Sequence, residues 1–387
     1  MSEIGQDHLV ETEHRVTPLE LFFDLVFVFA LTQVTARLAD DPTWAGLLRG
    51  VLILAAVWWA WVAYAWLTDT VDAEEGGIRL AMFGAMGAML VVALTVPTAF
   101  EDDALLFAIA YLAVRLMHLV LYARGARDDA AVVAAVMRLA PTATFGPALF
   151  VLGAFLDDRA QLAAWIGALV VDWVGPALGR GRGWRVHASH FAERHALIVI
   201  IALGESLVAL GAGAAGLPID AGLVVTALLG VVVLAALWWL YFDVVAIVAE
   251  RKLSEATGVA RALMARDSYS YLHFPMVAGI VLVALALEKT LAHHGDQLAV
   301  VPAVGLCGGL ALYLLGHVCF RLRNVRTLNR QRLVAAVALV ALVPVATEVP
   351  ALAALAGAAA LMGGLVAYEA IRFREARARV RRPQLAG

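Results

Sequence analysis

The sequence predicts an all-α polytopic membrane protein with about twelve transmembrane helices and both termini in the cytoplasm. The 387-residue chain is 63% hydrophobic and only 16% charged, whereas a soluble chain carries about 25% charged residues. The mean hydropathy is +0.84. The apolar residues gather in many segments of the length at which a helix of ~20 residues crosses the bilayer core.

The predicted spans are separated by short polar or charged segments. Their expected bounds are 19–38, 44–67, 78–99, 104–124, 130–154, 160–179, 195–213, 220–247, 269–290, 298–320, 332–346 and 350–371. The eleventh span is the shortest, and Pro344 and Pro350 interrupt the chain beside it. The acidic N-terminus lacks the basic region of a cleaved signal peptide, so the first apolar run is expected to remain as a helix.

Basic residues are distributed unevenly among the segments that connect the spans. Of the 29 Lys and Arg residues, 23 fall in the terminal segments and in every second connection, whereas the opposite connections hold Arg37, Arg159 and Lys289. Because basic loops stay in the cytoplasm, both termini are predicted to lie there, which requires an even number of spans. The basic tail is expected to lie against anionic headgroups, at about 1 kcal/mol per basic residue.

The second half of the chain echoes the first, which predicts a parallel 6+6 internal repeat. Residues 57–69 read VWWAWVAYAWLTD and residues 237–243 read LWWLYFD, and each run lies in the second span of its half. Parallel repeats are common in transporters, whose sites lie between the halves near the midplane. The expected organisation is an N-terminal segment 1–18, a first repeat 19–185, a second repeat 186–371 and a basic tail 372–387.

The first span carries two acids, Glu20 and Asp24, in an otherwise apolar run. Residues four apart share a helix face, and Thr17 and Thr35 fall on the same stripe. A carboxylate at the centre of a membrane helix costs about 2.5–3.5 kcal/mol on insertion scales, so it usually faces a cavity or a partner. We therefore predict a proton or cation site at Glu20 and Asp24, with a buried structural pair to an Arg of a neighbouring helix as the alternative.

Glu205 lies about ten residues inside the predicted seventh span, near the middle of the bilayer. It is expected to complete the ion- or proton-binding site by facing Asp24 across the repeat interface, where the two acids would share a proton or a cation. Gly204 beside it would allow a neighbouring helix to approach closely. The alternative is a neutral glutamic acid that is hydrogen-bonded within the bundle.

Three basic residues inside spans are candidates for moving or balancing charge. Histidine titrates near neutral pH, so His118 in the fourth span and His317 in the tenth are candidates for a charge relay. The alternative is that each is a structural histidine whose hydrogen bonds are satisfied within the bundle. Arg115 shares a helix face with His118. It is the expected counter-ion for Asp24 or Glu205, with a substrate-binding role as the alternative.

His190, Glu193 and Arg194 lie just before the predicted start of the seventh span. We expect them to form a cytoplasmic gate or a cluster of ion pairs. Their spacing is not the HExxH pattern that places two histidines on one helix face, so no metal site is predicted. No P-loop or hydrolase motif occurs in a suitable context, and we expect no cofactor. A net charge of −3 gives no indication of nucleic-acid binding.

The run TPLELFFDLVFV, from Thr17 to Val28, resembles a signature of the bacterial low temperature requirement A (LtrA) family, and so does the stretch 190–206. The resemblance covers essentially the whole chain. It implies a multi-pass membrane protein without an established biochemical activity, in a family named after a cold-growth phenotype. His195 departs from the aromatic residue often found there. The family motif positions fall on Glu20, Phe23, Asp24, His190, Glu193, Arg194, Gly204 and Glu205.

Together these features predict a proton- or cation-coupled secondary transporter of the bacterial cytoplasmic membrane that acts on an unidentified small molecule. A cation channel is the alternative, because an acidic helix in each half could also line a pore. A further alternative is a non-transporting structural or sensory membrane protein linked to growth at low temperature. An enzyme is not expected, because no recognised nucleophile accompanies the acids and histidines. The expected partners are the lipid bilayer, its anionic lipids, and a proton or monovalent cation.

Overall fold

The computed structural model describes residues 15–382. The regular secondary structure of this part of the chain is helical, and turns and loops connect the helices; one isolated β-bridge joins Gln297 and Pro350. Its first six long helices are α1 (Pro18–Asp40), α2 (Trp44–Thr70), α3 (Gly76–Thr95), α4 (Ala104–Gly125), α5 (Ala130–Gly153) and α6 (Asp158–Leu178). A short 3₁₀ turn, η1 (Val96–Thr98), extends α3. Most of the predicted segment 1–18 and the end of the predicted tail 372–387 lie outside the described residues.

The second half contains longer helices that are interrupted by two π-helical segments. It comprises α7 (Ala188–Ala214), α8 (Ala221–Phe242), α9 (Val245–Glu255), α10 (Gly258–Met264), η2 (Ala265–Tyr271), α11 (His273–Ala292), α12 (Val300–Ala303), η3 (Val304–Gly308), α13 (Gly309–Val325), α14 (Arg330–Ala346), α15 (Ala351–Arg372) and α16 (Arg374–Arg381). The π segments lie inside the continuous helices 258–292 and 300–325.

Within residues 15–382, eleven helices are long and apolar enough to cross a membrane. The predicted fold class is therefore confirmed as an all-helical polytopic membrane protein. The predicted eleventh span, 332–346, forms α14, whose 17 residues make a helix about 26 Å long. The count of twelve spans depends on whether α14 crosses the membrane, and it stays a prediction.

Two helical segments of the second half are longer than their predicted spans, because each helix continues through charged residues at its end. The predicted span 195–213 begins at Ala188 instead, so His190 and Arg194 lie within the first turns of α7. The predicted span 220–247 continues as α9 to Glu255, after a break at Val244. A prediction based on hydropathy ends a span at the first charged residues. The helix itself can continue through them when these residues have partners of opposite charge or lie at the membrane surface.

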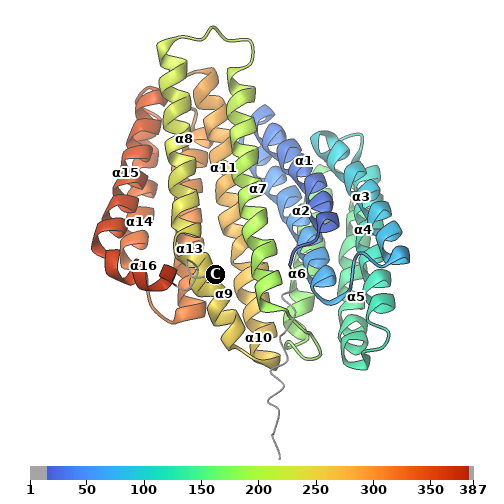
Figure 1. Cartoon of the computed structure of the whole chain (residues 1–387). Coiled ribbons are helices and arrows are strands. Elements are labelled where there is room, and N and C mark those ends of the chain that lie inside the picture. The colour runs from blue at the N-terminus through green and yellow to red at the C-terminus, as the bar shows by residue number, and fades with distance from the viewer. Residues whose placement is uncertain (1–14, 383–387) are drawn as a thin grey trace, which may run out of the picture.

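Figure 1 shows the helices of the first half on one side of the molecule and those of the second half on the other. The long helices are roughly aligned with a common axis, whereas the short α16 lies across it. α1 contacts both α7 and α11, and α2 contacts α7, so these four helices join the two halves. α2 and α11 are the most buried of the candidate spans. The polar residues on the faces of α1, α2 and α7 that meet one another therefore lie in the interior of the molecule.

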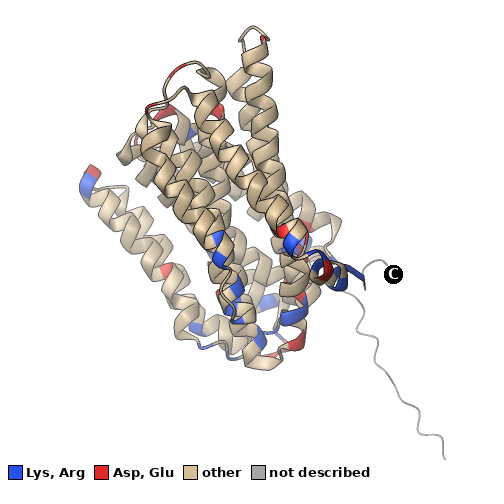
Figure 2. Ribbon diagram, turned by 90° about the vertical axis from the view of Figure 1, so that its left-hand side faces the viewer, with Lys and Arg blue, Asp and Glu red and all other residues tan. Residues whose placement is uncertain are grey.

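The outer faces of the bundle are apolar. Large side chains such as Leu80, Phe145, Leu228 and Val334 are exposed, as expected for helices that contact lipid tails. In Figure 2 most Lys and Arg residues lie toward the lower part of the molecule, whereas the loops at its upper end carry mainly Asp and Glu. This asymmetry agrees with the uneven distribution of basic residues along the sequence.

Candidate functional site

The start of α1 fixes the first acid of the site. Thr17 and Glu20 form a capping box, in which the Thr17 hydroxyl accepts from the Glu20 N–H and the Glu20 carboxylate accepts from the Thr17 N–H at 2.9 Å. Such reciprocal caps satisfy two backbone donors that a helix start otherwise leaves free. Asp24 follows one turn later on the same buried face of α1. Both acids point away from lipid, as the sequence predicted.

α7 supplies the positive groups that face these acids. Arg194 donates from Nη1 to Glu20 at 2.7 Å and from Nη2 to Asp24 at 2.8 Å. His190, one turn earlier, places Nε2 at 3.0 Å from Glu20 Oε1. Both side chains are buried. The sequence alternative of a structural pair between Asp24 and an Arg of a neighbouring helix therefore describes one component of the site.

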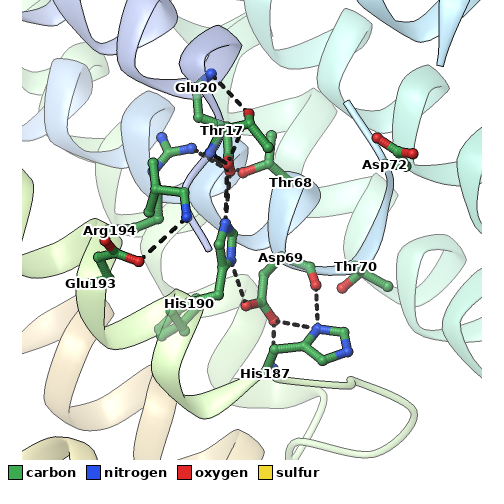
Figure 3. Close-up of polar contacts among 12 residues, drawn as sticks. Thr17, Glu20, Thr68, Asp69, Thr70, Asp72, His187, His190, Glu193 and Arg194 are labelled. Carbon is green, nitrogen blue, oxygen red and sulfur yellow. Dashed lines mark hydrogen bonds and ion pairs between the residues drawn. The ribbon is translucent and has the colours of Figure 1, made fainter. Parts of the chain in front are cut away.

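α2 closes the site from the third side. Asp69 Oδ1 lies 3.0 Å from His190 Nδ1, and the Thr68 hydroxyl accepts from Arg194 at 3.1 Å. Figure 3 shows the His190 ring between Glu20 and Asp69, with Arg194 beside the Glu20 carboxylate. We call Glu20, Asp24, Asp69, His190 and Arg194 the charge network.

The charge network holds three carboxyl groups against one guanidinium and one imidazole. A carboxylate only accepts hydrogen bonds, so each nitrogen of His190 must donate if both neighbouring acids are ionised. The ring is then an imidazolium; if it is neutral, one of the acids carries the proton instead. Either way the group of side chains shares a proton in a buried site. Asp24 Oδ2 is also buried without a hydrogen-bond partner, whereas Asp24 Oδ1 accepts from Trp61 at 3.0 Å and from Arg194.

His187 lies just before α7 at the edge of the network. Its backbone N–H donates to Asp69 Oδ2 at 2.9 Å, and its ring Nδ1 lies 2.6 Å from the Asp69 carbonyl. The hydrogen bond to Asp69 raises the pKa of His187 above its ordinary value. The half-exposed ring of His187 thus connects the buried carboxyl of Asp69 to the exterior.

Glu193, predicted to share a gate with His190 and Arg194, is separated from them. It is exposed, and its carboxylate accepts from the Val16 N–H at 3.3 Å. His190 and Arg194 instead face inward to the acids of α1. The three residues lie on one helix end, but only His190 and Arg194 belong to the charge network.

Glu205 does not meet Asp24, and this expectation is wrong. Asp24 binds Arg194, and Glu205 lies eleven residues beyond Arg194 on α7, about 16 Å along the helix axis. The buried Glu205 carboxyl lies beside Thr35 instead, near the other end of α1. Gly204 does not receive a neighbouring helix, because a Cβ added there would meet nothing within 4 Å.

Arg115 pairs with neither Asp24 nor Glu205, which corrects the predicted counter-ion. It binds Asp172 of α6 at 2.7 Å, and both side chains are buried. His118 lies one turn further along α4 and packs against Tyr64 and Tyr122. This group lies within the first half, apart from the charge network.

His317 belongs to a corresponding group in the second half. Its Nδ1 accepts from Arg332 of α14 at 2.9 Å, and Arg332 binds Glu369 of α15 at 2.8 Å. Because a guanidinium can only donate, His317 is neutral in this arrangement, with its proton on Nε2. His317 thus contacts the Arg332–Glu369 pair of the second half, whereas His118 lies one helical turn from Arg115 of the Arg115–Asp172 pair in the first half.

Asp69 and Thr68 are functional candidates that sequence reasoning missed. They end the run VWWAWVAYAWLTD, which attracted attention as a repeat element and for its tryptophans. An acid one turn after Trp66 in an apolar span carries the same signal that identified Asp24. Asp69 falls just outside the predicted span 44–67, so it does not count among the acids inside spans. Among the described residues, no group of three or more His, Cys, Asp or Glu side chains is arranged to hold a metal ion.

Fold and site together define a multi-pass α-helical membrane protein with a buried charge network between its halves. The sequence model of the bacterial low temperature requirement A protein (LtrA) matches residues 15–367, and the chain therefore belongs to this family. It is also 31% identical over 324 residues to the uncharacterized protein RA0937 of Rhizobium meliloti (strain 1021), covering 80% of this chain and 78% of that protein. No solved structure matches the chain.

Proposed function

We propose that this LtrA family protein is a proton-coupled secondary transporter of the bacterial cytoplasmic membrane, and that the charge network is its protonation site. The observation that carries this proposal is the His190 ring, held between Glu20 and Asp69 at 3.0 Å on each side. A buried imidazole between two acids binds and releases a proton with a rearrangement of its hydrogen bonds. Membrane transporters use such Asp, Glu and His groups as proton relays.

The charge network lies between the two halves of the protein, so its protonation state can affect how the halves are positioned relative to each other. Glu20, Asp24 and Asp69 come from α1 and α2, whereas His190 and Arg194 come from α7. Loss of the shared proton would leave one more negative charge in a low-dielectric site, which is strongly unfavourable. The halves then separate or admit water at this point. Proton binding and movement of the halves are coupled in this way.

The proposed architecture is a parallel 6+6 repeat with α14 as the eleventh of twelve spans. α1 and α7 run in the same direction, because Asp24 meets Arg194 and Thr35 lies beside Glu205 at the same sequence offset. Five further spans between them would bring the chain back to the same side of the membrane. Each half also buries one Arg against an acid of its sixth span, Asp172 or Glu369.

The remaining predicted residues have secondary roles in this proposal. Glu205 is a second proton or cation site further along the α1–α7 interface, where its Oε2 is buried without a hydrogen-bond partner. Arg115, His118 and His317 set the charge within each half. The basic α16 is held to α8 by Arg377 and Asp243 at 2.5 Å, where its exposed arginines lie against anionic lipid. The protein acts without a cofactor and catalyses no covalent reaction.

Proton movement in proteoliposomes tests the proposal. Vesicles that contain the purified protein and a pH-sensitive dye receive an inward proton gradient, in buffers that each offer one class of solute. We expect acidification above that of protein-free vesicles with at least one class, and saturation with solute. His190→Gln keeps hydrogen-bonding groups beside Glu20 and Asp69 but cannot carry the proton, so it reduces the flux by more than about tenfold.

Glu193→Gln is the matched control, because Glu193 lies on the same helix end outside the network. It retains the wild-type flux. Equal flux in wild type and folded His190→Gln would remove the proposed protonation site. Continuous single-channel currents in place of slow saturable flux would identify a channel. Absence of flux with every solute and under proton, sodium or potassium gradients would move the assignment to a structural or sensory protein.

A further inference from the structure

A cavity of about 50 Å³ lies between the two halves, apart from the charge network. Its walls come from α2 and α4 of the first half and from α10 and η2 of the second. Trp66 of α2 and Ser270 of η2 both line the cavity. A hydrogen bond connects the two halves here, because Trp66 Nε1 donates to Ser270 Oγ at 2.9 Å. The cavity therefore changes shape whenever the halves move.

Two buried polar side chains line this cavity without full hydrogen bonding. Arg115 is 1% exposed and uses Nη2 for Asp172, while its Nε and Nη1 have no partner. His118, 2% exposed, has at most the backbone of Ala63 as a partner, which can engage only one of its two ring nitrogens. Buried polar groups are almost always satisfied. These unsatisfied donors point to a ligand that accepts hydrogen bonds.

The lining selects a negatively charged acceptor. Arg115 and Arg266 both line the cavity, and no Asp or Glu is among the described residues that line it. Arg266 already binds Asp267 at 2.6 Å, so the free guanidinium donors belong to Arg115. Arg115 keeps its pairing with Asp172, so its free N–H groups add a second acceptor without breaking the first. Carboxylates are the anions that guanidinium groups bind with short, charge-assisted hydrogen bonds.

The size and the remaining walls select the rest of the ligand. Trp59, Trp66, Tyr122 and Trp184 surround the cavity with aromatic surface, which suits a methyl or short alkyl group. At about 10–15 Å³ for one water-sized sphere, a volume of about 50 Å³ suits a ligand of only a few non-hydrogen atoms. A carboxylate with a very short alkyl chain has this size and this division into polar and apolar parts.

The cavity is also connected to the charge network. Trp66 lies one turn before Asp69 on α2, and its ring contacts Phe191 of α7 at 5.0 Å between centroids. A ligand against Trp66 therefore acts on the helix that holds the Asp69 carboxyl beside His190. Binding in the cavity and protonation in the network involve the same helix contacts.

We propose that this cavity binds a short-chain monocarboxylate of the size of acetate, with its carboxylate on Arg115 and His118 and its alkyl group against Trp59 and Trp66. The assignment of this ligand as the transported substrate rests on the proposed transporter function. The binding site itself does not, so the two are tested separately.

Titration of the full-length protein in detergent with acetate tests the binding site. Tryptophan fluorescence reports the cavity, with calorimetry as a second readout, and acetamide is the neutral ligand of the same shape. We expect saturable binding of acetate and at least about tenfold weaker binding of acetamide, because hydrogen bonds to charged groups contribute roughly 1.5–3 kcal/mol.

Two variants keep the fold and change the site. Arg115→Lys retains the charge opposite Asp172 but removes most donors, and His118→Phe removes the imidazole without leaving a buried partner unpaired. Each weakens acetate binding by about tenfold or more. Arg332→Lys changes the corresponding pair with Glu369 in the other half and keeps the wild-type affinity. No saturable binding to the wild type, or equal affinity in both site variants, overturns the proposal.

Exchange of labelled acetate in proteoliposomes, measured above protein-free vesicles, then tests the link to transport. Binding with exchange that Arg115→Lys impairs supports the site as the substrate site. Binding without exchange or any proton-coupled flux retains the site and overturns the transporter. Proton-coupled flux of another solute without acetate binding retains the transporter and overturns the site.

Discussion

At the residue scale, the central feature of the charge network is that each basic side chain contacts two carboxyl groups. Arg194 binds Glu20 and Asp24, and His190 lies between Glu20 and Asp69. Burying charges is unfavourable unless every charge has a close partner of opposite sign. The loss of one positive side chain therefore affects more than one acid.

Arg194→Gln is expected to lower the stability of the protein in detergent by about 3–5 kcal/mol, because it leaves buried carboxylates without their cation. Adding Asp24→Asn to this variant recovers part of the loss, since one of the orphaned charges is removed. Thermal unfolding of the single and double variants measures this coupling. Glu193→Gln, one residue away but exposed, changes stability by less than about 0.5 kcal/mol. Additive effects of Arg194→Gln and Asp24→Asn would contradict the ion pair.

At the element scale, the central helices of the second half pack with their backbones in close approach. A Cβ on Gly279 of α11 would lie 2.6 Å from the Gly309 carbonyl oxygen, and one on Gly309 would lie 2.8 Å from the Gly279 carbonyl oxygen. Small residues at such crossings are typical of membrane helices, whose association depends on close packing. Both glycines lie in continuous helices that also contain a π-helical segment.

Gly279→Ala is expected to destabilise the protein by about 1–3 kcal/mol, because the added methyl group meets backbone atoms that cannot rotate away. Gly363→Ala in α15 is the matched control, since a Cβ there meets nothing within 4 Å. It should be neutral or stabilising by up to about 1 kcal/mol, as alanine is the better helix former. Melting temperatures of the two variants provide the comparison. Equal effects would show that α11 and α13 are further apart.

At the scale of the whole molecule, the number of spans decides on which side the C-terminus lies. The short α14 is only about 4 Å shorter than a hydrocarbon core of ~30 Å, and local thinning of the bilayer accommodates such a mismatch. Crossing by α14 places α16, with its many arginines, on the side where basic residues gather.

Reporter fusions therefore distinguish twelve spans from eleven. Green fluorescent protein fused after Gly387 should fluoresce, as should a fusion before Met1, because it matures in the cytoplasm. Alkaline phosphatase inserted at Leu217, between α7 and α8, should be active outside. A dark C-terminal fusion that is stably expressed, together with a fluorescent N-terminal one, would show that α14 does not cross.

Sequence reasoning reached the membrane class and most of the span bounds because hydropathy measures the main driving force directly. It also identified Glu20, Asp24, His190 and Arg194, since each is a charge in or beside an apolar run. It did not reach their pairing, because the partners lie about 170 residues apart and meet only when α1 and α7 pack. The contacts of Arg115 with Asp172 and of Glu205 with Thr35 depend on helix rotation, which apolar segments of nearly uniform hydropathy do not encode.

The π-helical segment η2 gives the span 258–292 a property that a regular helix lacks. A π turn accommodates one extra residue within a helix. The position of this extra residue can shift along the helix when neighbouring backbone hydrogen bonds exchange. If it left η2, the part of the span before it would turn by about 100° and advance by about 1.5 Å. Ser270, which accepts hydrogen bonds from Trp58 and Trp66, would then release both tryptophans at once, while the rest of the span stayed helical.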